Sequence, residues 1–240
     1  PPLLILGIFF LVPLCYLLFI SFMTNSATSL FDIEPTLTNY TEIFSDPFYW
    51  LIIQRTLLST ATVLILCLLL GYPVAFYAAH LSPRGRLIML MIMMVPLMVS
   101  NVVRAYFEAV TLGLLTILLP FMVVSLTNSL TTIDKRFTEA AHSLGAGPWR
   151  TFLRVTLPLS SPGIASGLML VTFLALSAYV SIALLGGPRY KLLVSFVFDS
   201  VSTFRWPRAA ALSFVLLLIA LIIAVAIQLI IRPQRVQGKG

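Results

Sequence analysis

The residues best suited to a chemical role lie in one polar segment, 134–158, between long apolar runs. Its first half, from Asp134 to Leu144, contains good helix formers, and Asp134 stands where a negative charge favours the amino end of a helix. Apolar side chains recur along it at helical spacing, at Phe137, Ala140, Ala141 and Leu144. We therefore predict a short amphipathic helix with a single apolar stripe.

The second half of the segment predicts a bend and another short helix. Gly145 and Gly147 allow the backbone to turn, and Pro148 suits the first position of a helix. We expect this second helix to end at Pro158 and Pro162. Its own apolar stripe consists of Trp149, Phe152, Leu153 and Leu157. Such a rigid elbow can sit in a groove of another protein and carry force. A pair of helices lying on the lipid surface is equally compatible with the pattern.

Catalytic and metal-binding patterns are not found in the sequence. The glycine string Gly145-Ala146-Gly147-Pro148 lacks the Gly-Lys-Ser/Thr that holds phosphates, so we expect no ATP hydrolysis by this chain. His80 and His142 are far apart, and Cys15 and Cys67 lie within apolar runs. We therefore predict no enzyme activity, no metal site and no cofactor in the chain itself.

The composition indicates that the elements holding this segment are membrane helices. Of 240 residues, 60% are hydrophobic and only 10% are charged, which excludes an ordinary soluble enzyme and a disordered chain. Apolar runs near the 20 residues that a membrane-crossing helix needs predict an all-α, polytopic protein of six spans. These spans are expected at about 3–22, 54–79, 87–104, 110–131, 162–185 and 208–231. Gly71, Gly113, Gly163 and Gly167 within them fit close helix packing or helices broken near a central path.

The distribution of charge orients the spans. The loops on the side of segment 134–158, with the carboxyl-terminal tail, hold nine basic and two acidic residues, whereas the opposite side holds six of each. The positive-inside rule places the first side in the cytoplasm, together with both termini. The first loop, 23–50, contains no Lys or Arg and faces outward, either as a docking surface or as a solvated connector.

Glu139-Ala140-Ala141, followed by Gly145 and later by Leu157-Pro158, resembles the EAA motif of ABC-importer permeases. The resemblance covers nearly the whole chain and favours the spermidine/putrescine branch, through the strings L-G-Y-P-V-A-F at 70–76, V-P-L-M at 95–98, V-V-R-A-Y at 102–106, L-L-P-F-M-V at 118–123 and L-L-G-G-P at 184–188. It implies the type I ABC importer permease fold in a bacterial inner membrane. The transported solute would be a polyamine, or alternatively an amino acid derivative, an opine or a phosphonate; a non-ABC channel or intramembrane enzyme is the remaining alternative.

The same resemblance implies a set of partners. These are a second, similar permease, two copies of a cytoplasmic ATPase that hold ATP and Mg²⁺, an external solute-binding protein and the surrounding lipid, with no nucleic acid. Segment 134–158 would couple the ATPases to the spans, with Glu139 available for a salt bridge or cap on the partner. The implied coupling residues are Glu139, Ala140, Ala141, Leu144, Gly145, Pro148, Trp149, Arg150 and Pro158.

A path for ammonium groups should present carboxylates or aromatic faces. Candidates near the outer ends of the spans are Tyr106, Glu108, Tyr179 and Asp199, although Glu108 can instead pair with Arg104, four residues away. Tyr49 and Trp206 fit interfacial anchors better. Because the family usually carries a longer stretch before its Leu-Pro-Phe-Met region, we also expect residues to be missing between Val110 and Thr111.

Overall fold

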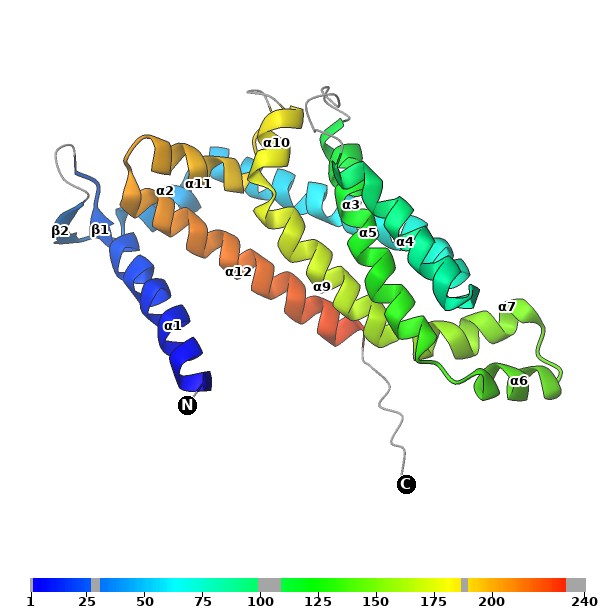
Figure 1. The fold of residues 1–240 in the computed structure, drawn as a ribbon. Coiled ribbons are helices and arrows are strands. Elements are labelled where there is room, and N and C mark those ends of the chain that lie inside the picture. Colours follow the sequence, from blue (N-terminus) through cyan, green and yellow to red (C-terminus); the bar gives the residue numbers. More distant parts are fainter. Residues whose placement is uncertain (1, 27–30, 99–108, 187–189, 232–240) are drawn as a thin grey trace.

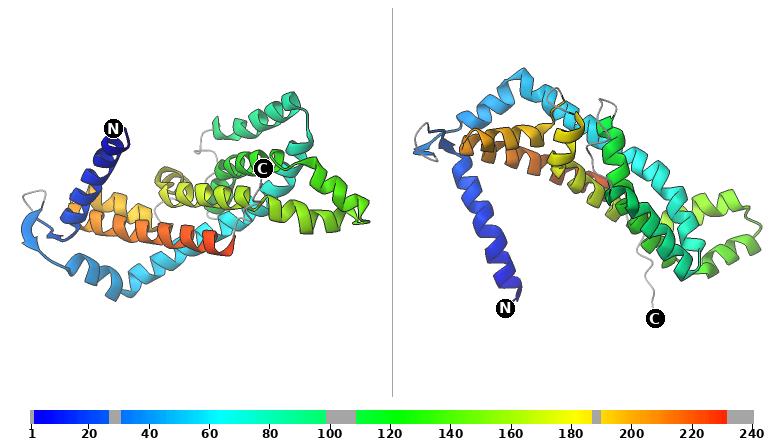
Figure 2. Two further views of the ribbon diagram at one scale, coloured as in Figure 1. Left: turned by 90° about the horizontal axis from the view of Figure 1, so that it is seen from below. Right: turned by 45° about the horizontal axis from the view of Figure 1, so that its top comes forward.

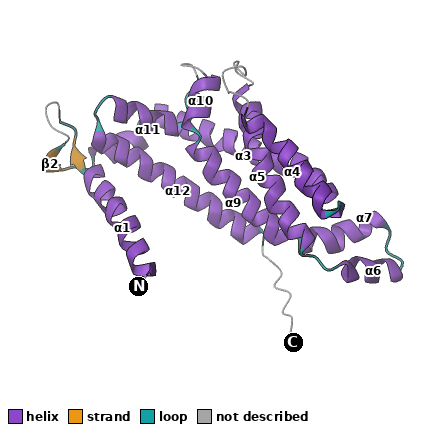
Figure 3. Cartoon of the chain, viewed as in Figure 1, coloured by secondary structure: helices purple, strands orange, loops and turns teal. Residues whose placement is uncertain are grey.

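The computed structural model describes residues 2–26, 31–98, 109–186 and 190–231, and the described chain is almost entirely helical (Figure 3). The first helix, α1, spans Pro2–Ser21. A two-stranded antiparallel hairpin of β1 (Met23–Thr24) and β2 (Asp32–Pro35) and the short helix α2 (Thr38–Ser45) follow it. The outward loop predicted at 23–50 is therefore partly ordered structure, and its last residues already belong to the next helix.

Long helices make up the body of the molecule. They are α3 (Pro47–His80), α4 (Pro83–Met98), α5 (Ala109–Thr131), α9 (Ser161–Ser177) and α12 (Trp206–Ile230). The helix α3 begins seven residues before the predicted boundary at 54, because Asp46 caps its amino end by accepting a hydrogen bond from the Phe48 amide at 2.8 Å. The helix α5 runs unbroken through Val110 and Thr111, where the omission was expected; that omission remains a prediction.

Within the described residues, three helices are long and apolar enough to cross a membrane: Pro47–His80, Val110–Thr131 and Trp206–Ile230. A fourth span is formed if Pro148–Leu159 and Ser161–Ser177, which are bent by 61° from each other, count as one. The predicted span 162–185 is not a single helix. The chain breaks at Ala178, and α10 (Tyr179–Gly186) and α11 (Leu193–Ser202) follow with new directions (Figure 1).

The helices α3, α5 and α9 pack side by side along much of their length (Figures 1 and 2). Glycines allow this close approach: a Cβ at Gly163 would lie 2.2 Å from Ser129 Cβ, and one at Gly167 would lie 2.6 Å from Met122 Sδ. The core of this bundle includes the fully buried Val63, Met122, Val123, Leu126 and Val171. Close packing is therefore the explanation for these two glycines.

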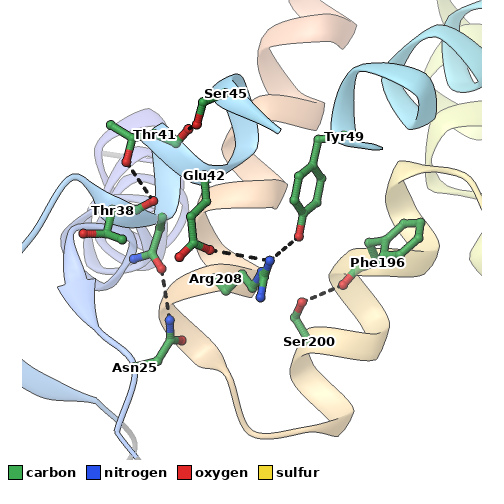
Figure 4. A network of polar contacts seen from close by, with 10 residues as sticks. Asn25, Thr38, Thr41, Glu42, Ser45, Tyr49, Phe196, Ser200 and Arg208 are labelled. Carbon is green, nitrogen blue, oxygen red and sulfur yellow. Dashed lines mark hydrogen bonds and ion pairs between the residues drawn. The ribbon is translucent and has the colours of Figure 1, made fainter. Parts of the chain in front are cut away.

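A second, smaller core lies at the other end of the bundle, where α2, α3, α11 and α12 meet. Arg208 holds this corner together, since its guanidinium contacts the Tyr49 hydroxyl and lies 3.6 Å from a Glu42 carboxylate oxygen (Figure 4). Tyr49 is 5% exposed, so the prediction that it is an interfacial anchor is wrong: its ring packs under Arg208. The helix α1 diverges from the rest of the bundle (Figure 2), leaving side chains such as Phe9 exposed.

Candidate functional site

The segment 134–158 folds as an elbow that projects from one end of the α3–α5–α9 bundle (Figure 1). Its first arm is α6 (Lys135–Ser143), which is capped by Asp134, whose carboxylate accepts a hydrogen bond from the Arg136 amide at 2.9 Å. Within this arm the Ser143 hydroxyl donates to the Glu139 carbonyl at 3.0 Å. The helix and its acidic cap agree with the prediction from sequence.

The bend of the elbow is a Schellman motif centred on Gly145. The Ala146 amide donates to the Ala141 carbonyl at 3.0 Å and the Gly145 amide donates to the His142 carbonyl at 2.9 Å. Gly145 has φ +79°, in the left-handed region that side chains with a Cβ disfavour, although a Cβ there would meet no atom within 4 Å. The glycine is thus required by its backbone angle and not by crowding. Gly147, with φ −69°, is under no such constraint.

The second arm ends at Leu159, between Pro158 and Pro162, where the sequence predicted its end. It starts at Pro148 as α7 (Pro148–Thr151), widens into a π-helical turn over Phe152–Thr156 and continues as α8 (Leu157–Leu159). In the widened turn the Leu157 amide bonds to the Phe152 carbonyl, five residues back. Pro158 is accommodated near the start of α8, and the chain enters α9 after the 61° bend.

The elbow exposes large apolar side chains at its outer surface. Leu144 is 88% exposed, Trp149 71% and Phe137 47%, so the apolar stripe of α6 does not pack against the chain's own core. Glu139 and Arg150 are also exposed, and within the described residues no group pairs with the Glu139 carboxylate. Of the predicted coupling residues, seven are exposed and two are half-buried, the latter being Ala141 and Pro158.

The opposite side of the second arm is anchored firmly to α3. The Phe152 ring makes edge contacts with Tyr72 and Phe76, at centroid distances of 5.6 and 5.8 Å. The Tyr72 hydroxyl shares a buried hydrogen bond of 2.7 Å with the Ser160 hydroxyl, at the bend into α9. These anchors were not identified from the sequence. Their only local signal is the spacing of Tyr72 and Phe76, which puts two aromatic rings on one helix face.

A cavity of about 440 Å³ separates the elbow from the nearby ends of α3, α4 and α5. On its rim, Arg86 donates from its guanidinium to the Ala78 and Ala79 carbonyls at 3.2 and 3.0 Å. This arginine therefore satisfies the open carbonyls at the end of α3, where a positive charge is favourable. The elbow meets the bundle through Phe152 and through Leu157, which both pack against its core.

The predicted path residues are only partly within the described chain. Tyr106 and Glu108, with Arg104, lie outside it. Tyr179 stacks on Phe198 of α11, with a centroid distance of 3.9 Å and an interplanar angle of 16°. Asp199 accepts a hydrogen bond from the Lys191 ammonium at 2.5 Å. Tyr179 on α10 and Asp199 on α11 therefore lie at the end of the bundle away from the elbow (Figure 1).

Comparison with known proteins places these features in a family. Residues 68–236 match the family described as "Binding-protein-dependent transport system inner membrane component". The chain is 32% identical to the spermidine/putrescine transport system permease protein PotB of Haemophilus influenzae, over 90% of this chain and 87% of that protein. It is also 32% identical to the permease protein PotC of Escherichia coli K12, over 52% of this chain and 48% of that one.

A solved structure shares the fold. A chain in the crystal structure of a bacterial alginate ABC transporter, in complex with an alginate pentasaccharide-bound periplasmic protein, superposes with a TM-score of 0.74. It has 18% sequence identity and the match covers 96% of this chain and 91% of that one. The chain therefore belongs to the family of binding-protein-dependent transport system inner membrane components, the permeases of ABC importers.

Proposed function

We propose that this chain is the permease subunit of a polyamine importer and that its elbow, residues 134–158, receives the force of a separate ATPase. The observation that carries the proposal is the difference in exposure between the two sides of the elbow. Its outer side exposes Leu144, Trp149 and an unpaired Glu139 carboxylate, whereas its inner side is anchored to α3 through Phe152. Exposed large apolar side chains around a charge are typical of a protein-docking surface.

The assembly that we propose around the chain has three kinds of protein partner. A second, similar permease completes the path, two copies of an ATPase bind ATP and Mg²⁺ and dock on the elbows, and an external solute-binding protein delivers the solute. The chain itself hydrolyses no ATP. It crosses the bacterial inner membrane six times, with the elbow and both termini in the cytoplasm. Support for this orientation comes from the excess of basic residues on the elbow's side of the sequence.

The solute that we propose is a polyamine of the spermidine or putrescine type. The resemblance to PotB over 90% of the chain supports this choice. The contacts of Tyr179 and Asp199 agree with it, because aromatic faces and carboxylates are the groups that hold ammonium ions. We assign these two residues to the path, and Tyr106 and Glu108 remain candidates for it by sequence alone.

Variants of the elbow in the assembled transporter test its coupling role. We expect Glu139→Lys and Leu144→Ser to reduce ATP-driven polyamine uptake at least tenfold and to weaken co-purification of the ATPase. Arg136→Gln on the same helix is the matched control: its side chain is 90% exposed and lies 3.9 Å from Asp134, so its loss should change little. Normal uptake by Glu139→Lys and Leu144→Ser would contradict docking of the ATPase on the elbow. So would variants that still bind the ATPase but whose elbow no longer associates with lipid.

A further inference from the structure

A lysine at the outer end of the bundle is held by the two kinds of group that bind an alkylammonium ion. The Lys191 Nζ atom lies 2.5 Å from an Asp199 carboxylate oxygen and 5.7 Å from the centre of the Phe196 ring. Phe196 and Asp199 are three residues apart on α11 and therefore share one face of that helix. A carboxylate beside an aromatic face forms a binding site for a primary ammonium group.

Residues on both sides of Lys191 are hydrogen-bonded to α3. The Leu193 amide donates a buried hydrogen bond of 3.0 Å to the Thr56 hydroxyl, and the Tyr190 hydroxyl is hydrogen-bonded to the Ser59 hydroxyl. Phe196 is itself packed edge-on against Phe48, at a centroid distance of 5.4 Å. The carboxylate and the ring are thus held in place, and the flexible lysine side chain is the part that can leave.

Solute can reach this ion pair without a change in the fold. The side chain of Lys191 is 38% exposed and that of Asp199 is 42% exposed. The Tyr179–Phe198 stack belongs to another face of α11, because Phe198 is two residues from Phe196 along the helix.

A lysine at this position also favours displacement of the side chain from Asp199 by a solute. Only three of the 15 basic residues are lysines, and Lys191 is the one that stands on the outer side of the predicted spans. Arginine would hold a carboxylate through two parallel hydrogen bonds, whereas lysine offers one mobile point charge. The lysine side chain is four methylene groups ending in an ammonium ion, which is the same chemical unit as one end of putrescine.

We propose that Asp199 and Phe196 form a subsite for one terminal ammonium group of a polyamine, and that Lys191 fills this subsite until the solute displaces it. The inference rests on the proposed polyamine import and adds the residues that select for the cation. Lys191 acts as an internal competitor, so Asp199 stays paired while the path is empty, and the solute enters by exchange of one ammonium for another.

Binding of radiolabelled putrescine to the purified permease–ATPase complex, without binding protein, tests the exchange. We expect Lys191→Met, which keeps an unbranched apolar side chain, to lower the half-saturating putrescine concentration about two- to fivefold, the factor that an exposed ion pair is worth. Asp199→Asn should raise that concentration, and the double variant should behave as Asp199→Asn. Competition by n-butylamine but not by n-butanol would identify the ammonium group as the recognised feature.

A matched control separates exchange from general electrostatics. Arg205→Gln removes one exposed positive charge from the same outer end without touching the Asp199 carboxylate contact. If Lys191→Met and Arg205→Gln improve binding equally, or if neither Lys191→Met nor Asp199→Asn changes it, the subsite is wrong although polyamine import stands. If the wild-type complex neither binds putrescine nor imports any polyamine, the proposed function fails and the subsite fails with it.

Discussion

Replacing Gly145 by alanine isolates the role of one backbone angle in the elbow. At φ +79° a residue with a Cβ costs about 1–2 kcal/mol relative to glycine. The added Cβ meets no atom within 4 Å, so crowding contributes nothing and the whole cost is conformational. If the ATPase binds only the bent elbow, this cost reduces the bent population relative to open forms by about 5- to 30-fold.

The consequence should appear in coupling and not in the stability of the bundle. We expect Gly145→Ala to weaken binding of the ATPase to the permease by a factor in that range, as measured by titration of the ATPase onto reconstituted permease. The temperature at which the permease unfolds in detergent should change little, because the bend lies outside the packed core. Gly145→Asn should recover part of the affinity, since asparagine tolerates the left-handed region.

The neighbouring glycine provides the control. Gly147 lies in the same turn, has φ −69° and, like Gly145, has no atom within 4 Å of an added Cβ. Gly147→Ala should therefore leave ATPase binding unchanged. Equal losses in Gly145→Ala and Gly147→Ala would refute the reasoning from backbone angle, as would full binding by Gly145→Ala.

Two further predictions concern the packing that supports the elbow. Gly163→Ala should destabilise the permease by about 1–3 kcal/mol, because its Cβ would lie 2.2 Å from Ser129 Cβ. Gly71→Ala should cost less, because the nearest atom to its Cβ is in the flexible Met122 side chain, at 3.3 Å. Thermal unfolding in detergent compares the two variants. Tyr72→Phe removes the 2.7 Å hydrogen bond to the Ser160 hydroxyl and should cost about 1 kcal/mol, with faster hydrogen exchange confined to the start of α9. Unchanged exchange there would show that this bond does not anchor the bend.

Local signals were sufficient to predict the elbow. Its acidic cap at Asp134, its glycine at the left-handed position and its proline at the start of the second arm each act within a few residues. The early start of α3 also had a local signal, the Asp46-Pro47 pair. The predicted boundary missed it because it followed the apolar run, which Arg55 interrupts. In both cases the interactions join residues close in sequence, and they can therefore be predicted from the sequence.

The contacts that anchor the elbow to the bundle could not be predicted in this way. Phe152 meets Tyr72 across 80 positions of sequence, and its apolar character is equally compatible with lipid or with a partner. Likewise, the break at Ala178 lies inside a continuous apolar run, where hydropathy carries no signal for a change of direction. Packing partners and helix directions depend on the whole fold, which one sequence does not encode locally.

The arrangement of the two cores explains how a push on the elbow could move the outer end. The second arm continues directly into α9 and is pinned to α3, while α9 is locked to α5 by the close contact at Gly163. These helices must therefore move together. At the outer end, α3 and the end of α9 also enter the smaller core, where α11 carries Asp199. A tilt of the bundle would consequently displace the helix that holds the Lys191–Asp199 pair, which would link the proposed coupling to the proposed solute exchange.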